Sequence, residues 1–210
     1  MVSKEVKNIF DSEILSQMMN DTLLGTGDSD RHVMTIFSIA LASKGKKLLE
    51  LGVRNGKTTL PLLYASWINN GKLISIDAKK SDFSMPNRLE ECWEYIESDA
   101  IEYLMKVQNE KFDLIYIDDW HSYEHVKKEL ELVDKIIGPS GIVILHDLMY
   151  GNTEPFYHTD LSVKEGQWAK GGPYRAVAEL DTNFWEWATI PWNNGLTILR
   201  KKYSSKYHNK

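Results

Sequence analysis

Cysteine is nearly absent from this 210-residue sequence, and other deficits exclude further classes of protein. The one cysteine, Cys92, has no partner for a disulfide within the chain, and no cysteine cluster could form a structural zinc site. Proline and glycine number 6 and 13, too few for a collagen-like or low-complexity chain. No run approaches the ~18 uncharged apolar residues of a membrane-spanning helix, and the charged N-terminal stretch is unlike a signal peptide. We therefore expect no membrane partner.

An excess of positive charge is also missing. The chain has 25 lysines and arginines against 30 aspartates and glutamates, which gives a formal net charge of −5. Nucleic-acid binding depends largely on basic side chains that neutralise phosphates, so we expect no nucleic-acid partner. The remaining composition is that of an ordinary soluble protein, which we expect to be cytoplasmic.

Short β-rich runs alternate with helical patterns, which is typical of a parallel sheet covered by helices on both faces. The predicted strands are residues 47–51, 73–77, 93–97, 113–118, 142–145, 184–190 and 196–200. The last two are separated by PWNNG, a turn sequence that predicts a hairpin. The sequence thus predicts an α/β fold: a Rossmann-like, doubly wound sheet of seven strands, mostly parallel, with an antiparallel C-terminal hairpin strand.

Helices are predicted between these strands. The segment at 1–45 is expected to be helical, with a core face at Val33, Ile36, Phe37 and Ala40. The helix before the fifth strand is expected to stop at Gly138 and Pro139.

One segment does not fit this alternation. Residues 149–172 have no clear period and contain four glycines, and the segment is too long for an ordinary connection. We expect it to be a lid or an acceptor loop within a single domain spanning residues 1–210, of which 203–210 are a tail.

Ligands of open α/β sheets bind beyond the carboxyl ends of the strands, so the residues there are informative. After the first predicted strand, Gly52 and Gly56 precede a helix whose free N–H groups can face a ligand. Asp77 ends the second strand, where a carboxylate can accept both hydrogen bonds of a ribose diol. Asp99 follows the third strand and is a natural helix N-cap. Neither a P-loop nor a full dinucleotide fingerprint is present, and the pattern favours a nucleoside-containing ligand.

Two carboxylates are predicted to meet at the ends of the fourth and fifth strands. Asp118 ends the fourth strand, and His146 and Asp147 end the fifth. Neighbouring carboxylates repel unless a cation or proton lies between them, and their oxygens suit Mg²⁺. His121 follows closely and could cap or pack its helix, whereas His125 is expected to lie on the helix surface without a special role.

These segments together resemble the class I S-adenosylmethionine-dependent methyltransferases. The segments are LLELGVRNGKTT, LISID, IESDA, FDLIYIDDWHSYEHVKKELELVDKIIGPSGIVILHD and NNGLTILRK. The likeness is greatest to the branch of macrocin-type and other sugar O-methyltransferases, whose Asp-x-x-His-x-Tyr-Glu signature is matched by Asp118 to Glu124. It covers roughly residues 30–202 and identifies the chain as a single methyltransferase domain.

The resemblance implies a set of functional residues. S-adenosyl-L-methionine would be bound by Glu50, Gly52, Asn55, Gly56, Thr58, Asp77, Ser98, Asp99, Ala100 and Asp118. A divalent cation such as Mg²⁺ would be bound by Asp118, His146 and Asp147, with His121 and Asp118 as catalytic residues. The chain departs from the branch at Arg54, where glycine is frequent, and at Asp119–Trp120, which replaces a Gly-Asp order.

The implied reaction is metal-assisted O-methylation of a small-molecule hydroxyl acceptor, a sugar or glycosylated compound. Two alternative functions remain: the chain could be a nicotinamide-dependent oxidoreductase, or a non-catalytic cofactor-binding protein of the same fold. The sequence also leaves a homo-oligomer open, and it does not encode the identity of the acceptor.

Overall fold

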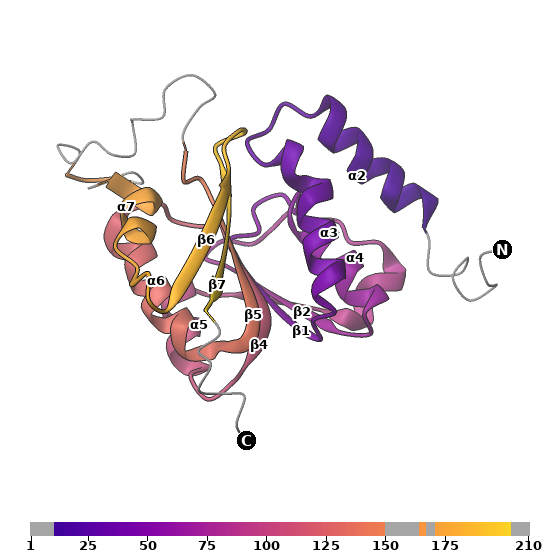
Figure 1. The fold of residues 1–210 in the computed structure, drawn as a ribbon. Helices are drawn as coiled ribbons and strands as arrows, with labels where there is room; N and C mark the ends of the chain where they lie inside the picture. Colours follow the sequence, from indigo (N-terminus) through magenta and orange to yellow (C-terminus); the bar gives the residue numbers. More distant parts are fainter. Residues whose placement is uncertain (1–10, 150–163, 167–170, 203–210) are drawn as a thin grey trace.

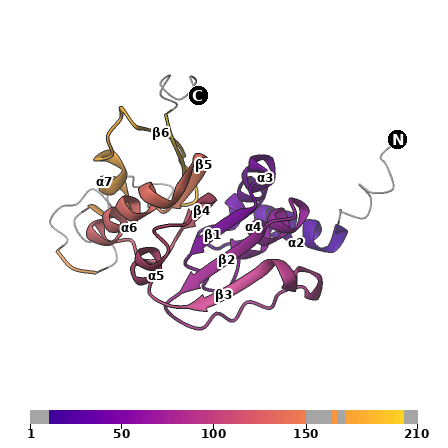
Figure 2. The same cartoon turned by 90° about the horizontal axis from the view of Figure 1, so that it is seen from below.

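The computed structural model describes residues 11–149, 164–166 and 171–202, and within them seven strands form one sheet (Figures 1 and 2). The strand order is β3-β2-β1-β4-β5-β7-β6. The strands are β1 (Lys47–Leu51), β2 (Lys72–Asp77), β3 (Trp93–Glu97), β4 (Phe112–Ile117), β5 (Ile137–His146), β6 (Trp185–Ile190) and β7 (Leu196–Lys201). Strands β1 to β5 are parallel, and β7 is antiparallel to both β5 and β6. The predicted sheet and its closing hairpin are confirmed.

Helices cover both faces of this sheet (Figure 1). One face carries α2 (Ser12–Leu24), α3 (Val33–Ser43) and α4 (Thr59–Ile68), and the other carries α5 (Ala100–Lys106), α6 (Tyr123–Ile136) and α7 (Gly172–Ala178). Short 3-10 helices lie at Asp30–His32 and Asn87–Cys92. The predicted core face of α3, made of Val33, Ile36, Phe37 and Ala40, is buried.

The central strands are apolar on both sides because each side faces a separate core. In β4, Leu114 belongs to the core under α2–α4, whereas Ile115 and Ile117 belong to the core under α5–α7. This is the two-residue alternation of a strand covered by helices on both faces. The helices change face between β1 and β4, so the carboxyl ends of these two strands form the switch point at which ligands bind in such sheets.

Strand β5 begins earlier than predicted, and this corrects the expected helix end at Gly138 and Pro139. Helix α6 ends at Ile136, and Ile137 already pairs with Phe112 of β4. The register then shifts between Phe112 and Leu114, so the glycine- and proline-containing stretch lies in an irregular strand. Turn residues in a bulged strand resemble a helix stop in sequence.

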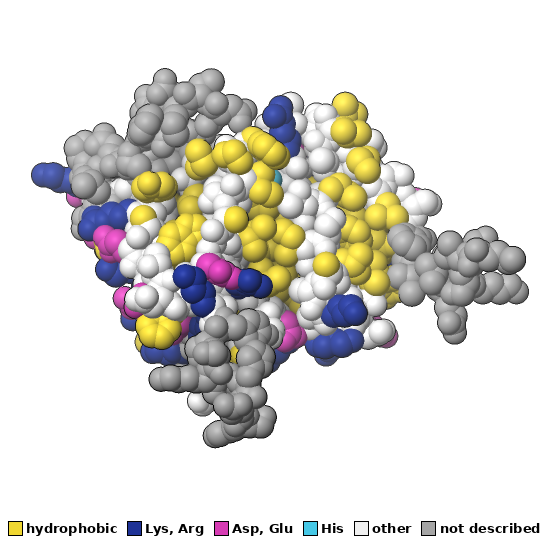
Figure 3. All heavy atoms as spheres, in the orientation of Figure 1, with side chains coloured by type: hydrophobic (Ala, Val, Ile, Leu, Met, Phe, Trp, Pro, Cys, Tyr) yellow, Lys and Arg dark blue, Asp and Glu magenta, His cyan; other side chains and the backbone are white. Residues whose placement is uncertain are grey.

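Most of the predicted loop at 149–172, and the tail at 203–210, lie outside the described residues. Hydrophobic side chains are visible over β6 and over the α2–α3 side of the molecule (Figure 3). Exposed apolar side chains of the described chain include Leu23, Leu24, Phe184 and Trp192. In the parts of the chain described, no helix is both long and apolar enough to cross a membrane.

Candidate functional site

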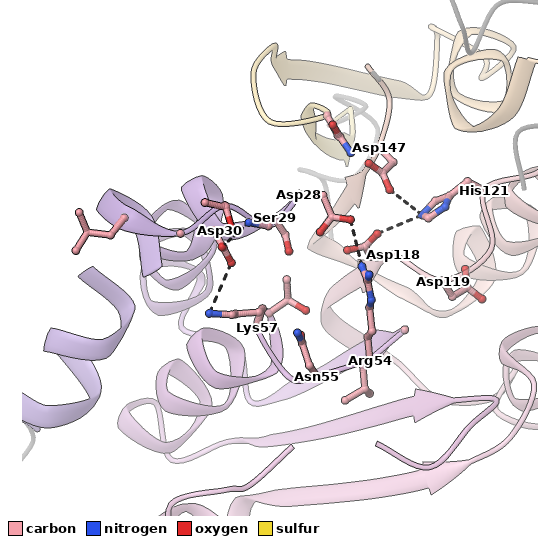
Figure 4. A pocket seen from close by; sticks show the side chains of 18 residues that line it. Asp28, Ser29, Asp30, Arg54, Asn55, Lys57, Asp118, Asp119, His121 and Asp147 are labelled. Atoms are coloured by element: carbon pink, nitrogen blue, oxygen red, sulfur yellow. Dashed lines mark hydrogen bonds and ion pairs between the residues drawn. The ribbon is translucent and has the colours of Figure 1, made fainter. Parts of the chain in front are cut away.

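A cavity of about 870 Å³ opens at the carboxyl ends of β1, β4 and β5 (Figure 4). Its wall comes from four parts of the chain: residues 24–30 before α3, the loop after β1, the ends of β4 and β5, and the turn between β6 and β7. The lining includes Leu24, Asp28, Ser29, Asp30, Gly52, Val53, Arg54, Asn55, Lys57, Thr58, Asp118, Asp119, His121, Asp147 and Asn194. Charged and polar groups therefore dominate the part of the wall that is described.

Gly52 lets the loop after β1 approach the end of β4 closely. Its φ is +90°, and a Cβ there would lie 2.1 Å from the carbonyl oxygen of Asp118. The backbone N–H of Asp118 donates to the carbonyl of Leu51 at 2.8 Å, which fixes the same junction. Gly56, with a φ of +79°, has its Cα against Phe83 and does not line the cavity. Both glycines are therefore explained by close packing within the chain.

Glu50 supports this loop from beneath. Its side chain is fully buried, and its carboxylate accepts hydrogen bonds from Thr58 Oγ1 at 2.8 Å, Thr59 Oγ1 at 2.9 Å and Ser75 Oγ at 2.7 Å. Burial raises the pKa of Glu50 to about 7, although the three hydroxyls act in the opposite direction. Glu50 is thus buried beneath the loop and stabilises it, whereas Thr58 lines the cavity.

Replacing Glu50 with glutamine should change how stability depends on pH. Since the folded pKa of about 7 exceeds the usual 4.5, the wild-type protein should lose free energy of unfolding as pH rises from 4.5 through 7. The loss from this one group is on the order of 3 kcal/mol. Glu50→Gln should not show this pH-dependent loss of stability. Urea unfolding at pH 4.5 and at pH 8 would measure the difference. The exposed Glu97→Gln is the control, and parallel pH profiles for wild type and Glu50→Gln would refute the prediction.

Asp77 holds the outer side of the same loop. One carboxylate oxygen accepts hydrogen bonds from the backbone N–H groups of Val53 and Arg54, both at 2.9 Å, and the other accepts from Lys79 at 2.9 Å. A carboxylate offers about four lone-pair positions, so one acceptor position is left for a ligand. Asp77 lies at the end of β2, beside the cavity wall defined above.

Asp99, which follows the third strand, forms the predicted helix N-cap. Asp99 accepts a hydrogen bond from the backbone N–H of Glu102 at 3.0 Å and begins α5. The backbone N–H of Ser98 donates to the carbonyl of Asp77 at 2.9 Å, which joins the ends of β2 and β3. Asp99 is exposed, and Ala100 is buried. These residues lie together with Asp77, outside the cavity lined by Asp118.

The ends of β4 and β5 bring Asp118, His121, His146 and Asp147 together. His121 Nε2 lies 3.2 Å from Asp118 Oδ1 and 3.0 Å from Asp147 Oδ2 (Figure 4). His146 Nδ1 lies 3.2 Å from Asp147 Oδ1 and 3.6 Å from Asp118 Oδ1. The predicted meeting of the two carboxylates is therefore present in the structure.

The histidines compensate the negative charge of this cluster. Although burial alone would raise the pKa of Asp118, the charge of His146 and the hydrogen bond of His121 hold it well below its usual range. Burial would lower the pKa values of His121 and His146, but the two carboxylates raise both above the usual value. Positive charge between Asp118 and Asp147 is thus strongly favoured.

The cluster has a donor set that fits a divalent cation. Ligand atoms of Asp118, His121 and Asp147 all lie within 4.8 Å of one another. His146 Nε2 lies 3.1 Å from the carbonyl of Asn193, to which it can donate, so Nδ1 is the nitrogen that faces the carboxylates. His146 Nδ1 and Asp147 Oδ1 are buried 3.2 Å from each other and have no hydrogen-bond partner outside the cluster among the described residues. The carboxylate oxygens of Asp118 and Asp147 suit Mg²⁺ or Mn²⁺.

Residues 49–148 match a family model described as a methyltransferase domain. The O-methyltransferase from Bacillus cereus, solved with SAH, is 15% identical with a TM-score of 0.66, covering 92% of each chain. TomG from Streptomyces achromogenes, an O-methyltransferase involved in tomaymycin synthesis and solved with SAM, is 15% identical with a TM-score of 0.64 over 92% of each chain. The chain has a methyltransferase fold. No curated protein sequence matches it.

MycE, a methyltransferase of the mycinamycin biosynthetic pathway, also has this fold. Its structure, with Mg and SAH bound, is 16% identical to the chain with a TM-score of 0.62. The match covers 93% of this chain and 55% of MycE.

Within this methyltransferase fold, His125 corrects the expectation of a surface residue without a role. Its side chain is 15% exposed, and its Nε2 lies 3.0 Å from Asp119 Oδ2 and 3.7 Å from Glu129 Oε1. Burial would lower the pKa of His125, but its hydrogen bond to Asp119 and the nearby carboxylate of Glu129 raise it to about 10. The spacing of four residues between His125 and Glu129 is the signal that could have found this pair in the sequence.

The wall before α3 is a second feature that the sequence did not reveal. Arg54 pairs with Asp28 at 3.2 Å across the cavity mouth, and Lys57 lies 3.7 Å from the buried Asp30. Behind the wall, the buried ring of His32 lies edge-on to His146 at 5.5 Å. These contacts join residues more than twenty positions apart, so no local motif marks them.

Proposed function

We propose that this chain is an S-adenosylmethionine-dependent O-methyltransferase that uses a divalent cation, Mg²⁺, and methylates a hydroxyl of a sugar or glycosylated small molecule. The observation that carries the proposal is the meeting of Asp118, His121, His146 and Asp147 beside the loop after β1, around one cavity. The family match and the SAH- and SAM-bound structures of the same fold support the cofactor. The Mg in the MycE structure supports the cation.

The cofactor site would extend along the ends of the first four strands. We assign its nucleoside end to Asp77, Ser98, Asp99 and Ala100, where Asp77 keeps a free acceptor position for a ribose hydroxyl. Its methionine end is assigned to Gly52, Asn55, Thr58 and Asp118, all of which line the cavity. Glu50 and Gly56 would act through the shape of the loop.

The reaction needs an acceptor oxygen that has lost its proton. When bound, S-adenosylmethionine supplies the methyl group on its sulfonium, and the cation lowers the pKa of the acceptor hydroxyl. Asp118 and Asp147, with His146 beside them, would hold the cation through their clustered ligand atoms. His121 Nε2 is directed into the same cluster and would take the proton of the hydroxyl as a general base.

A polyhydroxylated acceptor suits the described wall of the cavity. Asp28, Ser29, Asp30 and Lys57 offer hydrogen-bond donors and acceptors opposite the Asp118 cluster, whereas Leu24 and Val53 contribute apolar surface. A buried polar group favours a ligand that hydrogen-bonds to it, because an unpartnered group costs free energy. We further propose that residues 149–172, within a single domain of 1–210, supply the rest of the acceptor site.

Calorimetric titration with S-adenosylmethionine, and separately with NAD, tests the cofactor assignment. We expect binding of S-adenosylmethionine alone, and a loss of about 10- to 100-fold in affinity for Asp77→Ala, since the one charged hydrogen bond that Asp77 can still accept is worth about 1.5–3 kcal/mol. Asp82→Ala, an exposed acid in the loop that follows, should bind like wild type. Binding of NAD instead would support the oxidoreductase, and binding without methyl transfer to a panel of sugars and phenols would support a non-catalytic protein.

A further inference from the structure

A second group of potential ligands lies beside the first. Asp119 follows Asp118 directly, yet it lies apart from the Asp118–His121–Asp147 cluster (Figure 4). It contacts His125, which stands one helical turn from Glu129 on α6. The ligand atoms of Asp119, His125 and Glu129 lie within 4.8 Å of one another. We refer to these three residues as the α6 cluster.

Glu129 is the member of the α6 cluster that most needs an explanation. Its side chain is 0% exposed, and neither carboxylate oxygen has a hydrogen-bond partner. Asp119 Oδ1 is also buried without a partner. A buried carboxyl group without hydrogen bonds is unfavourable, and a cation bound by Asp119 and Glu129 would remove this cost. Two carboxylates and a neutral imidazole would instead balance the charge of one divalent cation.

The distances in the α6 cluster fit a small coordination sphere. Zinc binds imidazole nitrogen and carboxylate oxygen at about 2.0–2.2 Å, so in a tetrahedral site the ligand atoms lie about 3.4 Å apart. His125 Nε2 lies 3.0 Å from Asp119 Oδ2 and 3.7 Å from Glu129 Oε1, on either side of that value. A nitrogen and two carboxylates suit a transition-metal cation, whereas Ca²⁺ takes six to eight oxygens.

We propose that Asp119, His125 and Glu129 form a second cation site that binds Zn²⁺ or a similar transition-metal cation. The bound ion would tie the loop after β4 to α6. Asp118 and His121 lie in that loop, one residue before and two residues after Asp119. The ion would therefore fix the position of both residues without itself facing the cavity centre. The site stands on the α6 cluster alone and does not depend on the proposed methyl transfer.

Zinc affinity of the full-length chain, measured by competition with a chromophoric chelator in excess Mg²⁺, tests this site. We expect one equivalent of Zn²⁺ to be bound by wild type and by Asp147→Asn, in which the first cluster is impaired. Glu129→Gln should bind Zn²⁺ roughly 100-fold more weakly or worse, because even outer-shell changes cost 10- to 100-fold. Glu131→Gln makes the same chemical change at an exposed position of α6 and should bind like wild type.

Two results would overturn the proposal. Equal Zn²⁺ affinity of wild type and Glu129→Gln would mean that His125 serves only as an imidazolium between two acids. Loss of the ion in Asp147→Asn with retention in Glu129→Gln would place it in the first cluster. Should Glu129→Gln fail to fold, Asp119→Asn must show the same loss of Zn²⁺, and unchanged affinity there would refute the site. Because the readout is metal affinity, none of these results depends on S-adenosylmethionine or on turnover.

Discussion

Removing divalent cations with a chelator should abolish methyl transfer by this protein, and adding Mg²⁺ or Mn²⁺ should restore it. The reason lies in Asp118 and Asp147, which face each other across His121 at 3.2 and 3.0 Å from its Nε2. A cation held by these two carboxylates would lower the pKa of the acceptor hydroxyl, so its removal should leave the hydroxyl protonated. Release of S-adenosylhomocysteine, with an acceptor found in the sugar panel, would measure the effect.

Asp147→Asn should weaken cation binding by changing the protein instead of the solution. An amide keeps one oxygen ligand but removes the charge that attracts the cation, so half-maximal activity should require a much higher Mg²⁺ concentration. Asp134→Asn, an equivalent change at the far end of α6, should leave the Mg²⁺ requirement unchanged. Cofactor binding in chelator should persist, because Asp77 and the loop after β1 do not need the cation. Full turnover in chelator would refute the metal assignment and leave the pairing of Asp118 with Asp147 unexplained.

The parts of this site that the sequence predicted are those that follow from sheet topology. Parallel strands end at one edge, so Asp118 after β4 and Asp147 after β5 had to approach each other once the strands were neighbours. The same reasoning placed Asp77 beside the loop after β1, and period-two alternation placed residues such as Leu114 and Ile115 on opposite faces. In each case the regular geometry of strands determined the outcome.

The parts that could not be predicted depend on how loops turn. Asp118 and Asp119 are adjacent in sequence, yet their carboxylates enter different clusters, and only the path of the loop decides which. The resemblance to methyltransferases implied that Glu50 binds the cofactor, and the sequence did not reveal that its buried carboxylate is held by three hydroxyls beneath the loop. The sequence did not reveal that Gly52, besides lining the cavity, has no room for a Cβ because of the carbonyl of Asp118.

The cavity wall before α3 shows a further limit of the sequence. Asp28 meets Arg54 only because α3 and α4 pack side by side on one face of the sheet. No spacing rule relates positions so far apart in the chain. The cavity wall was therefore least predictable where it depends on packing between helices.

His121→Ala should lower turnover by about 10²- to 10⁴-fold, the usual contribution of a general base, while the affinity for S-adenosylmethionine changes little. The imidazole is held between Asp118 and Asp147 with a side chain only 12% exposed, so it is oriented toward the position we assign to the acceptor hydroxyl. A base must be unprotonated to act, and the rate should therefore fall as pH drops through its pKa. This acid limb of the wild-type rate profile should be absent in the variant, and added imidazole should restore part of the turnover.

The competing role for His121 is structural, because it stands just before Ser122, the N-cap of α6, and contacts the carboxylates of both Asp118 and Asp147. If that were its whole contribution, His121→Ala would lower the free energy of unfolding while its remaining activity kept the wild-type pH profile and did not respond to imidazole. Urea unfolding of the same preparation separates the two roles. Reduced stability alone is compatible with both, since removing the imidazole leaves Asp118 and Asp147 without their shared positive partner. The pH profile and the imidazole rescue are therefore decisive: only a proton acceptor at Nε2 links turnover to the charge of a single imidazole.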